Sequence, residues 1–483
     1  VEKLAGAKVA AASINKSGSF TFRATRVGED TTLAQMIRLV DEAASSKAPI
    51  AKLADKVAGV FVPVVIAIAV VTAAVWLIAT GGDVTRALTA GVAVLVISCP
   101  CALGLATPVA IMVGTGKGAE QGILIKSAEA LETLHLVDTV VLDKTGTLTQ
   151  GRPVVTDILP GEDMDEEGLL ILAACLEGPS EHPLAAAIVE ESRRRGLPIT
   201  SVGGFTAVHG RGVRAALGDR TCMGGNRAMM EEAGVELGSF PARAEELASQ
   251  GKTPLYFADE HRVLGLVAVA DTPKPTSAQA VAAFRRLGID VIMLTGDNQR
   301  TAGAIGAQLG VSQVMAEVLP QDKERKVKQL QDQGKKVAMV GDGINDAPAL
   351  ARADVGLAIG AGTDVAIESA DIVLMKSDLL DAAAAVELSK ATIRNIKQNL
   401  FWAFFYNSLG IPLAAGLFYA LGWTDVMLNP MFAAAAMSLS SVCVVTNALR
   451  LRFFKPKSVP ASPVPCPSGS CPVQPVPAPS EQP

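Results

Sequence analysis

The chain has 483 residues, of which 49% are apolar but only 4% aromatic, and its formal net charge is −5. This length exceeds that of a single domain, and the aliphatic excess favours segments that contact lipid. The small net charge, without a long basic run, argues against a nucleic-acid partner. The 7 cysteines are odd in number and widely spaced, which does not match a disulfide framework and favours a reducing compartment.

Four stretches without any charged residue have the length of membrane spans. They lie between Lys56 and Asp83, Arg86 and Lys117, Lys397 and Asp425, and Asp425 and Arg450. Each exceeds the roughly 20 apolar residues that a membrane-spanning helix needs. The alternative is core helices of a large soluble enzyme, which rarely lack every charge over four such runs. The four stretches pair as two hairpins, each with a short turn between its two stretches. Lysines and arginines flank the outer ends of both hairpins, so the positive-inside rule places the rest of the chain in the cytosol.

Between the hairpins, three short apolar segments each end at a polar motif. Thr139–Leu142 precedes DKTGTLT, Val291–Leu294 precedes TGDN, and Val337–Val340 precedes GDGINDAP. Ligands gather at the carboxyl ends of strands in a parallel α/β sheet, so the three motifs predict one site. The intervening segment 151–270 interrupts the alternation and is predicted to be an inserted domain.

The segment around Asp143 has the chemistry of a phosphorylation site. Asp143 ends an apolar strand, and residues 144–147 give a small, donor-rich backbone that suits a phosphate group. A carboxylate in this position can attack a phosphoryl group and form an aspartyl-phosphate. Asp342 and Asp346 supply the hard oxygen ligands that Mg²⁺ prefers, and Lys323 is suited to offset phosphoryl charge.

The three motifs at 143–149, 295–298 and 341–350 resemble those of the P-type ATPases, in the order and spacing of that family. Any one of them alone is compatible with a surface turn, but the combination is specific. The resemblance implies that ATP and Mg²⁺ are the cofactors. A soluble phosphatase of the same fold usually carries a second aspartate two residues after the nucleophile, where this chain has Thr145. Without an adjacent acid, the phosphoenzyme is expected to hydrolyse slowly, as an ion pump requires.

The same resemblance assigns roles to individual residues. Asp143 is implied as the phosphorylated nucleophile, while Asp342 and the Thr145 carbonyl are implied to hold Mg²⁺. Thr295 and Lys323 are implied to contact the phosphoryl group. The remaining members of the implied catalytic group are Lys144, Gly296, Asp297 and Asp346, the last as a support of the metal site.

Residues of the inserted segment resemble the nucleotide site of the heavy-metal branch of these pumps. Ser180-Glu181-His182-Pro183 precedes an alanine-rich helix, and His182 alone would be compatible with an ordinary helix start. Glu177 lies nearby in sequence, and tight glycine turns occur at 210–212 and 225–226. The resemblance implies that the adenosine part of ATP is bound by Glu177, His182, Gly210, Gly212, Gly225 and Asn226.

The second uncharged stretch contains Cys99-Pro100-Cys101, the motif that marks the heavy-metal pumps. Proline removes a backbone hydrogen bond and kinks a membrane helix, which can turn both sulfurs inward. The alternative is that buried thiols are inert packing. Together with Tyr406-Asn407 and with Met437 and Ser441, the pair resembles the copper(I) subgroup, which would hold transported Cu⁺ at Cys99, Cys101, Tyr406, Asn407, Met437 and Ser441.

Soft sulfur ligands favour copper(I) over zinc, and silver(I) would fit equally well. Zinc, cadmium and lead pumps tend to carry a lysine and an aspartate in the last two spans, where this chain has neither. The expected function is ATP-driven export of Cu⁺. Alternatives are a silver(I), zinc or cadmium pump, or a truncated metal-binding membrane protein that does not cycle. His135 is expected to be structural, and the proline-rich tail gives Cys466 and Cys471 no clear role.

The predicted fold combines membrane helices with a cytosolic α/β region of the haloacid dehalogenase type. The expected division is 1–50 as the end of an actuator domain, 51–136 as the first membrane hairpin with its link, 137–150 plus 271–385 as the phosphorylation domain, 151–270 as the nucleotide-binding domain, 386–452 as the second hairpin, and 453–483 as a disordered tail.

The resemblance also suggests what this chain lacks. Val1-Glu2-Lys3 resembles the sequence just after the Thr-Gly-Glu loop of the family, and that tripeptide is absent from the 483 residues. The chain as given is therefore expected not to complete a transport cycle. Expected partners are a copper ion, a lipid membrane and a cytosolic copper chaperone, with the protein integral to the plasma (inner) membrane.

Overall fold

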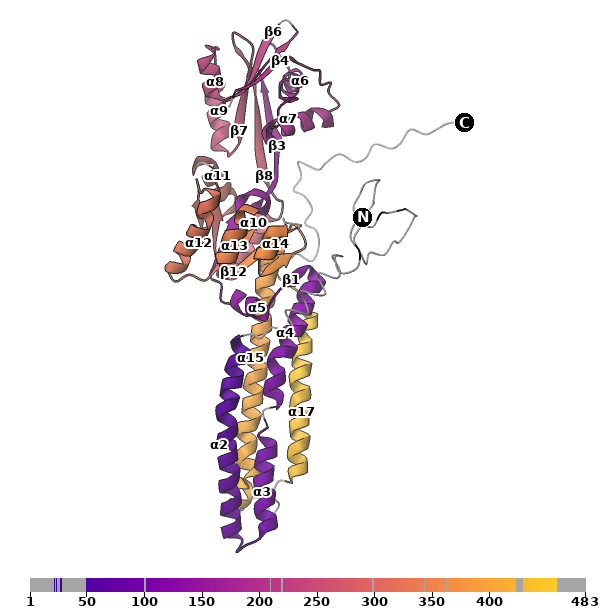
Figure 1. The fold of residues 1–483 in the computed structure, drawn as a ribbon, viewed down its shortest axis with the longest axis vertical. Coiled ribbons are helices and arrows are strands. Elements are labelled where there is room, and N and C mark those ends of the chain that lie inside the picture. The colour runs from indigo at the N-terminus through magenta and orange to yellow at the C-terminus, as the bar shows by residue number, and fades with distance from the viewer. Residues whose placement is uncertain are drawn as a thin grey trace, which may run out of the picture.

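The computed structural model describes residues 49–457, apart from 100, 209, 219, 298, 343, 361–363 and 423–428, together with 21, 23 and 27. Within this part of the chain, two β-sheets and a helical bundle follow one another along the long axis of the molecule (Figure 1). The segments expected to be the end of an actuator domain and the tail lie almost wholly outside the described residues.

The central sheet has seven strands drawn from distant parts of the chain. Its order is β1 (Ile123–Ile125), β13 (Ile372–Leu374), β12 (Val355–Ile359), β11 (Val337–Gly341), β2 (Thr139–Asp143), β9 (Asp290–Leu294) and β10 (Gln313–Met315). Every neighbouring pair is parallel except β1 and β13. Because β11, β2 and β9 are adjacent and parallel, the ends of the three predicted strands lie at one edge.

The strands of this sheet are apolar on both sides because helices cover both faces. Val140 and Leu142 of β2 belong to one core with α5 (Ala128–Leu134) and α10 (Ser277–Arg286). Val141 faces the opposite core, which holds Val327 of α12 (Lys323–Asp332) and Leu350 of α13 (Ala347–Arg352). Such continuous apolar runs are typical of buried parallel strands. Also near this sheet are α11 (Gln299–Leu309) and α14 (Asp364–Ser369).

The second sheet has six antiparallel strands, in the order β3 (Thr149–Pro160), β8 (Val263–Pro273), β7 (Thr253–Ala258), β6 (Arg220–Gly225), β5 (Gly212–Leu217) and β4 (Gly203–Val208). One face packs on α6 (Glu166–Glu177) and α7 (Pro183–Arg194), and the other on α8 (Arg227–Glu232) and α9 (Phe240–Ser249). The long pair β3 and β8 leads back to the central sheet (Figure 1).

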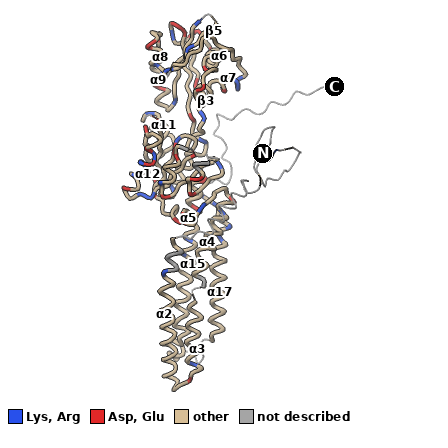
Figure 2. The backbone as a smooth tube through the Cα atoms, in the orientation of Figure 1, with Lys and Arg blue, Asp and Glu red and all other residues tan. Residues whose placement is uncertain are grey.

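The helical bundle extends from the other side of the central sheet and consists of α2 (Pro49–Ala79), α3 (Val84–Ile97), α4 (Cys101–Gln121), α15 (Leu380–Ala414), α16 (Leu417–Ala420) and α17 (Pro430–Leu449). Figure 2 shows charged residues spread over both sheets and few along these helices. Helices of the bundle pack closely where small residues face a neighbouring helix. A Cβ added at Gly410 of α15 would lie 2.8 Å from the Ile97 side chain of α3.

Two helices of the described chain are long and apolar enough to cross a membrane, Lys56–Ala79 within α2 and Pro430–Phe453, which includes α17. The expectation of four such helices is not confirmed. The second uncharged stretch divides into α3, which ends at Ile97, and α4, which begins at Cys101, so that α3 is a shorter apolar helix. The third forms only the last part of α15, whose first part is buried against the central sheet.

Candidate active site

Asp143 lies at the carboxyl end of β2, in the middle of the central sheet, and only 5% of its surface is exposed. Lys323, at the start of α12, donates from Nζ to Asp143 Oδ1 at 2.5 Å and to Asp346 Oδ1 at 2.7 Å. Asp346 is almost fully buried and follows β11, the strand beside β2. One ammonium group therefore joins two carboxylates from neighbouring strand ends.

A third carboxylate completes this cluster. One oxygen from each of Asp143, Asp342 and Asp346 lies within 4.8 Å of the others. Burial, followed by the charge of Asp346, raises the pKa of Asp143 to about 7, while Lys323 opposes the shift. The pKa of Asp342 is raised by the same two causes. Three carboxylates outnumber the two lysines that act on them, Lys323 and Lys274, and a divalent cation with oxygen ligands fits this donor set.

Glycines leave room for the carboxylates. Gly146 has φ +77°, and a Cβ there would lie 1.8 Å from Asp342 Oδ2, closer than any contact that two such atoms can make. A Cβ at Gly341 would lie 2.6 Å from Asp346 Oδ2. Thr145 precedes Gly146 in an extended conformation and is exposed. The buried Thr147 hydroxyl has no hydrogen-bond partner in the structure.

The TGDN motif lies across the same edge, after β9. Lys144 donates to Asp297 Oδ2 at 2.6 Å, which joins the segment after β2 to the segment after β9. Thr295 is buried, and its Oγ1 accepts from the Asp297 backbone N–H at 3.1 Å. An added Cβ at Gly296 would be 3.5 Å from the Val318 carbonyl, an ordinary contact, so the local packing does not require glycine there. Asn298 lies outside the described residues.

Two residues at the return from the second sheet were not predicted from the sequence. Lys274 donates from Nζ to the Gly146 carbonyl and, at 2.9 Å, to Ser377 Oγ. Asp271 accepts from Thr149 Oγ1 at 2.5 Å and from the Gly151 backbone N–H at 2.9 Å. Both residues therefore stabilise the turn after Asp143. The position of Lys274 between two prolines was the feature of the sequence that could have identified it.

The residues expected to bind adenosine form two groups around the second sheet. Gly210, Gly212, Gly225 and Asn226 make one corner, where Asn226 donates from Nδ2 to the Gly210 carbonyl at 3.0 Å. A Cβ at Gly212 would lie 2.1 Å from the Gly224 carbonyl, which excludes any side chain there.

Glu177 and His182 make the second group. Glu177 ends α6 and is 7% exposed, and burial raises its pKa to about 7 although a hydrogen bond with Ser180 opposes this. His182 is exposed and caps α7, with Nδ1 accepting from the Leu184 backbone N–H at 3.2 Å. In the described part of the chain, no hydrogen bond joins this group to the glycine corner.

The expected metal-binding residues of the bundle lie on α15, α17 and the segment between α3 and α4. Cys99 is half-buried and disulfide-bonded in the structure, and Cys101 begins α4. Tyr406 is 48% exposed, Asn407 is half-buried, and the half-buried Ser441 donates to the Met437 carbonyl at 3.5 Å. Among the histidine, cysteine, aspartate and glutamate side chains that the structure describes, the aspartate group has metal-binding geometry.

The haloacid dehalogenase-like hydrolase family matches residues 137–354. Copper-transporting ATPase 1 of Rhizobium meliloti is 52% identical over 94% of this chain and 55% of its own length. The copper-exporting P-type ATPase of Bacillus subtilis is 50% identical over 94% of this chain and 56% of its own length. The chain thus spans a little over half the length of these relatives.

A crystal structure of a zinc-transporting PIB-type ATPase in its E2.Pi state superimposes with a TM-score of 0.74 and 36% identity, over 88% of this chain and 68% of that one. The central sheet and its strand-end aspartate define a haloacid dehalogenase-like domain with an inserted antiparallel domain. The chain belongs to the PIB-type ATPases, the heavy-metal branch of the P-type ATPases.

Proposed function

We propose that the chain is the catalytic and metal-translocating part of a pump that moves Cu⁺ out of the cytosol at the expense of ATP. The observation that carries the proposal is the contact of Lys323 with both Asp143 and Asp346, beside Asp342. This arrangement supplies a nucleophile, a cation and a set of oxygen ligands at one strand edge.

In the proposed reaction, a carboxylate oxygen of Asp143 attacks the γ-phosphorus of ATP. A phosphorus–oxygen bond to Asp143 forms, the bond to the bridging oxygen of ADP breaks, and ADP leaves. Lys323 offsets negative charge as the phosphoryl group transfers, with Thr295 as a further donor. Mg²⁺, held by Asp143, Asp342 and the Thr145 carbonyl, would offset the charge of the phosphate oxygens.

The second sheet is proposed to hold the adenosine part of ATP. Its glycine corner admits close approach of a ligand to backbone, because Gly210 has open space where a Cβ would be. Glu177 is buried and its pKa is raised to about 7, so a large fraction of its carboxyl groups is protonated near neutral pH and can donate a hydrogen bond. We assign residues 151–270 to this nucleotide-binding domain, and 137–150 with 271–385 to the phosphorylation domain.

For the transported ion, two observations favour copper(I). The relatives named above are copper-transporting and copper-exporting ATPases. The chain also offers soft ligands, Cys99, Cys101 and Met437, and no lysine or aspartate within 401–422 or 430–449. Zinc is the second candidate, because a matching solved structure is that of a zinc-transporting ATPase. Silver(I) shares the chemistry of copper(I).

We further propose that the bundle is embedded in the plasma (inner) membrane, with both sheets in the cytosol. The two long apolar helices support this, as do the lysines and arginines at the end of the bundle nearest the sheets (Figure 2). A cytosolic copper chaperone is the expected donor of the ion.

The proposal is tested by labelling membranes that contain the protein with radioactive ATP under reducing conditions. Acid-stable label that appears with Cu⁺ and is removed by a copper(I) chelator supports the copper pump. Label that appears with Zn²⁺ and not with Cu⁺ would instead establish the zinc candidate.

A further inference from the structure

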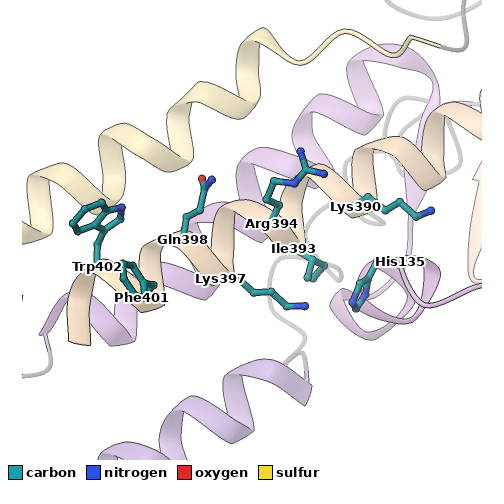
Figure 3. Close-up of a pocket in the computed structure, with 8 residues that line it drawn as sticks. All are labelled: His135, Lys390, Ile393, Arg394, Lys397, Gln398, Phe401 and Trp402. Atoms are coloured by element: carbon teal, nitrogen blue, oxygen red, sulfur yellow. The ribbon is translucent and has the colours of Figure 1, made fainter. Parts of the chain in front are cut away.

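A cavity of about 500 Å³ opens where α15 leaves the central sheet and passes the end of α5 (Figure 3). Four of its lining residues can carry a positive charge, and none of the described residues that line it is acidic. Figure 3 shows Lys397 extending from α15 toward His135, the residue that ends α5. The positively charged and aromatic residues that line it are His135, Lys390, Arg394, Lys397, Phe401 and Trp402.

The lining of α15 changes in character along the helix. Lys390, Arg394, Lys397 and Phe401 are spaced by three or four residues, so they share one face of the helix. Lys390 donates to the Leu287 carbonyl at 3.1 Å and is thereby held against the end of α10, a helix that packs on the central sheet. Arg394 and Lys397 are exposed and make no hydrogen bond or ion pair within the described part of the chain. The cavity therefore has two cations free to bind an anion.

The cavity also lies level with the expected surface of the membrane. The backbone N–H of Ile50, at the start of α2, donates to Glu132 of α5 at 2.9 Å, which fixes the start of that helix beside the cavity wall. The apolar span of α2 begins shortly after, at Lys56. Phe401 and Trp402 are 61% and 47% exposed, and tryptophan side chains gather at the level of lipid headgroups.

We propose that this cavity binds the phosphate headgroup of an anionic phospholipid, with Arg394 and Lys397 as its ligands and Trp402 against the upper acyl chain. Cations at the surface of an anionic membrane attract the headgroups, and an aromatic ring beneath them suits the boundary between headgroup and acyl chain. Through Lys390 and Leu287, the bound headgroup would lie next to the phosphorylation domain. This inference rests on the proposed insertion of the bundle in a membrane.

The test uses the whole chain in vesicles of phosphatidylcholine with a minor fraction of phosphatidylglycerol, in which either lipid carries brominated acyl chains that quench tryptophan. The contribution of Trp402 is obtained as the difference from a Trp402→Phe variant, because the chain has 3 tryptophans. We expect brominated phosphatidylglycerol to quench Trp402 more strongly than brominated phosphatidylcholine at the same mole fraction, with a preference of roughly fivefold for each cation.

The variant Arg394→Gln/Lys397→Gln is expected to lose this preference. Arg452→Gln/Lys455→Gln removes the same charge from exposed residues outside the cavity and is expected to keep it. Equal quenching by both lipids in the unmodified chain, or an unchanged preference in the Arg394/Lys397 variant, would overturn the lipid site. Absence of quenching by both lipids would instead contradict the membrane insertion itself. Release of the preference by soluble glycerol phosphate would show a site for small anions and would also overturn the proposal.

Discussion

Lys323 reaches Asp143 across 180 positions of sequence, with its Nζ 2.5 Å from Asp143 Oδ1. The pair is buried, and the same ammonium group also contacts Asp346. Burial acts to lower the pKa of Lys323, but the charges of Asp143 and Asp346 outweigh it and the pKa is raised. The lysine therefore stays charged, and it holds two carboxylates at a distance where they would otherwise repel each other.

Removing this lysine is expected to damage both stability and phosphorylation. Lys323→Met leaves Asp143 and Asp346 without their cation, and breaking a buried pair in this way costs about 3–5 kcal/mol. We also expect the rate of phosphoenzyme formation to fall by about 100-fold or more. Lys328→Met, an exposed position of the same helix, is the control. A labelling rate within threefold of the unmodified protein would argue against the assigned role.

Gly146→Ala tests whether the turn after Asp143 must leave space for Asp342. Both Gly146 and Gly196 have positive φ, +77° and +71°, so alanine strains the backbone at each by about 1 kcal/mol. Only at Gly146 does the new Cβ meet a carboxylate, whereas nothing lies within 4 Å at Gly196. We expect the Mg²⁺ concentration needed for half-maximal labelling to rise in Gly146→Ala and to stay unchanged in Gly196→Ala. Equal behaviour of the two variants would remove the steric argument.

Glu177 should make stability depend on pH. Its pKa is raised from 4.5 to about 7, so the folded protein binds this proton more tightly than the unfolded chain does. The contribution is complete below pH 4.5 and is lost as the pH rises to about 7, by on the order of 3 kcal/mol. Glu177→Gln should flatten this dependence of the free energy of unfolding on pH, as measured by hydrogen exchange in the second sheet. Glu167→Gln, an exposed position of the same helix, should leave it in place.

The cysteines of the bundle allow a matched test of copper binding. Under a reductant, which the disulfide at Cys99 requires, we expect Cys99→Ala to weaken Cu⁺ binding by at least tenfold in competition with a colorimetric chelator. Cys443 is a free, exposed cysteine of α17, and Cys443→Ala should bind as the unmodified protein does. Similar affinities for all three proteins would place the ion elsewhere.

The sequence predicted those elements of the fold that a local pattern of residues determines. Val140 and Leu142 belong to an uninterrupted apolar run before Asp143, which indicates a buried parallel strand, and β2 is such a strand. The count of membrane helices was less secure, because an uncharged stretch reports composition and not continuity. The second stretch is interrupted between the end of α3 at Ile97 and the start of α4 at Cys101, and at α15 the helix continues from the uncharged stretch into the core under the central sheet.

The residues of the candidate site were likewise predicted only in part. Motif spacing singled out Asp143, Asp342 and Asp346, which the structure brings within 4.8 Å. It did not single out Lys274 or Asp271, because their contacts with the turn after Asp143 arise only when β8 returns beside β3. Such contacts depend on tertiary geometry and leave no periodicity in the sequence.

The central claim is that Asp143 becomes phosphorylated, and the most direct measurement is acid-stable labelling from radioactive ATP in the Asp143→Asn variant. Asparagine keeps the size of the side chain but lacks the carboxylate nucleophile, so we expect no label although ATP still binds. Asp290→Asn, an exposed position at the start of β9, should label normally. Acid-stable label retained in Asp143→Asn, at the level of the unmodified protein, would contradict the account.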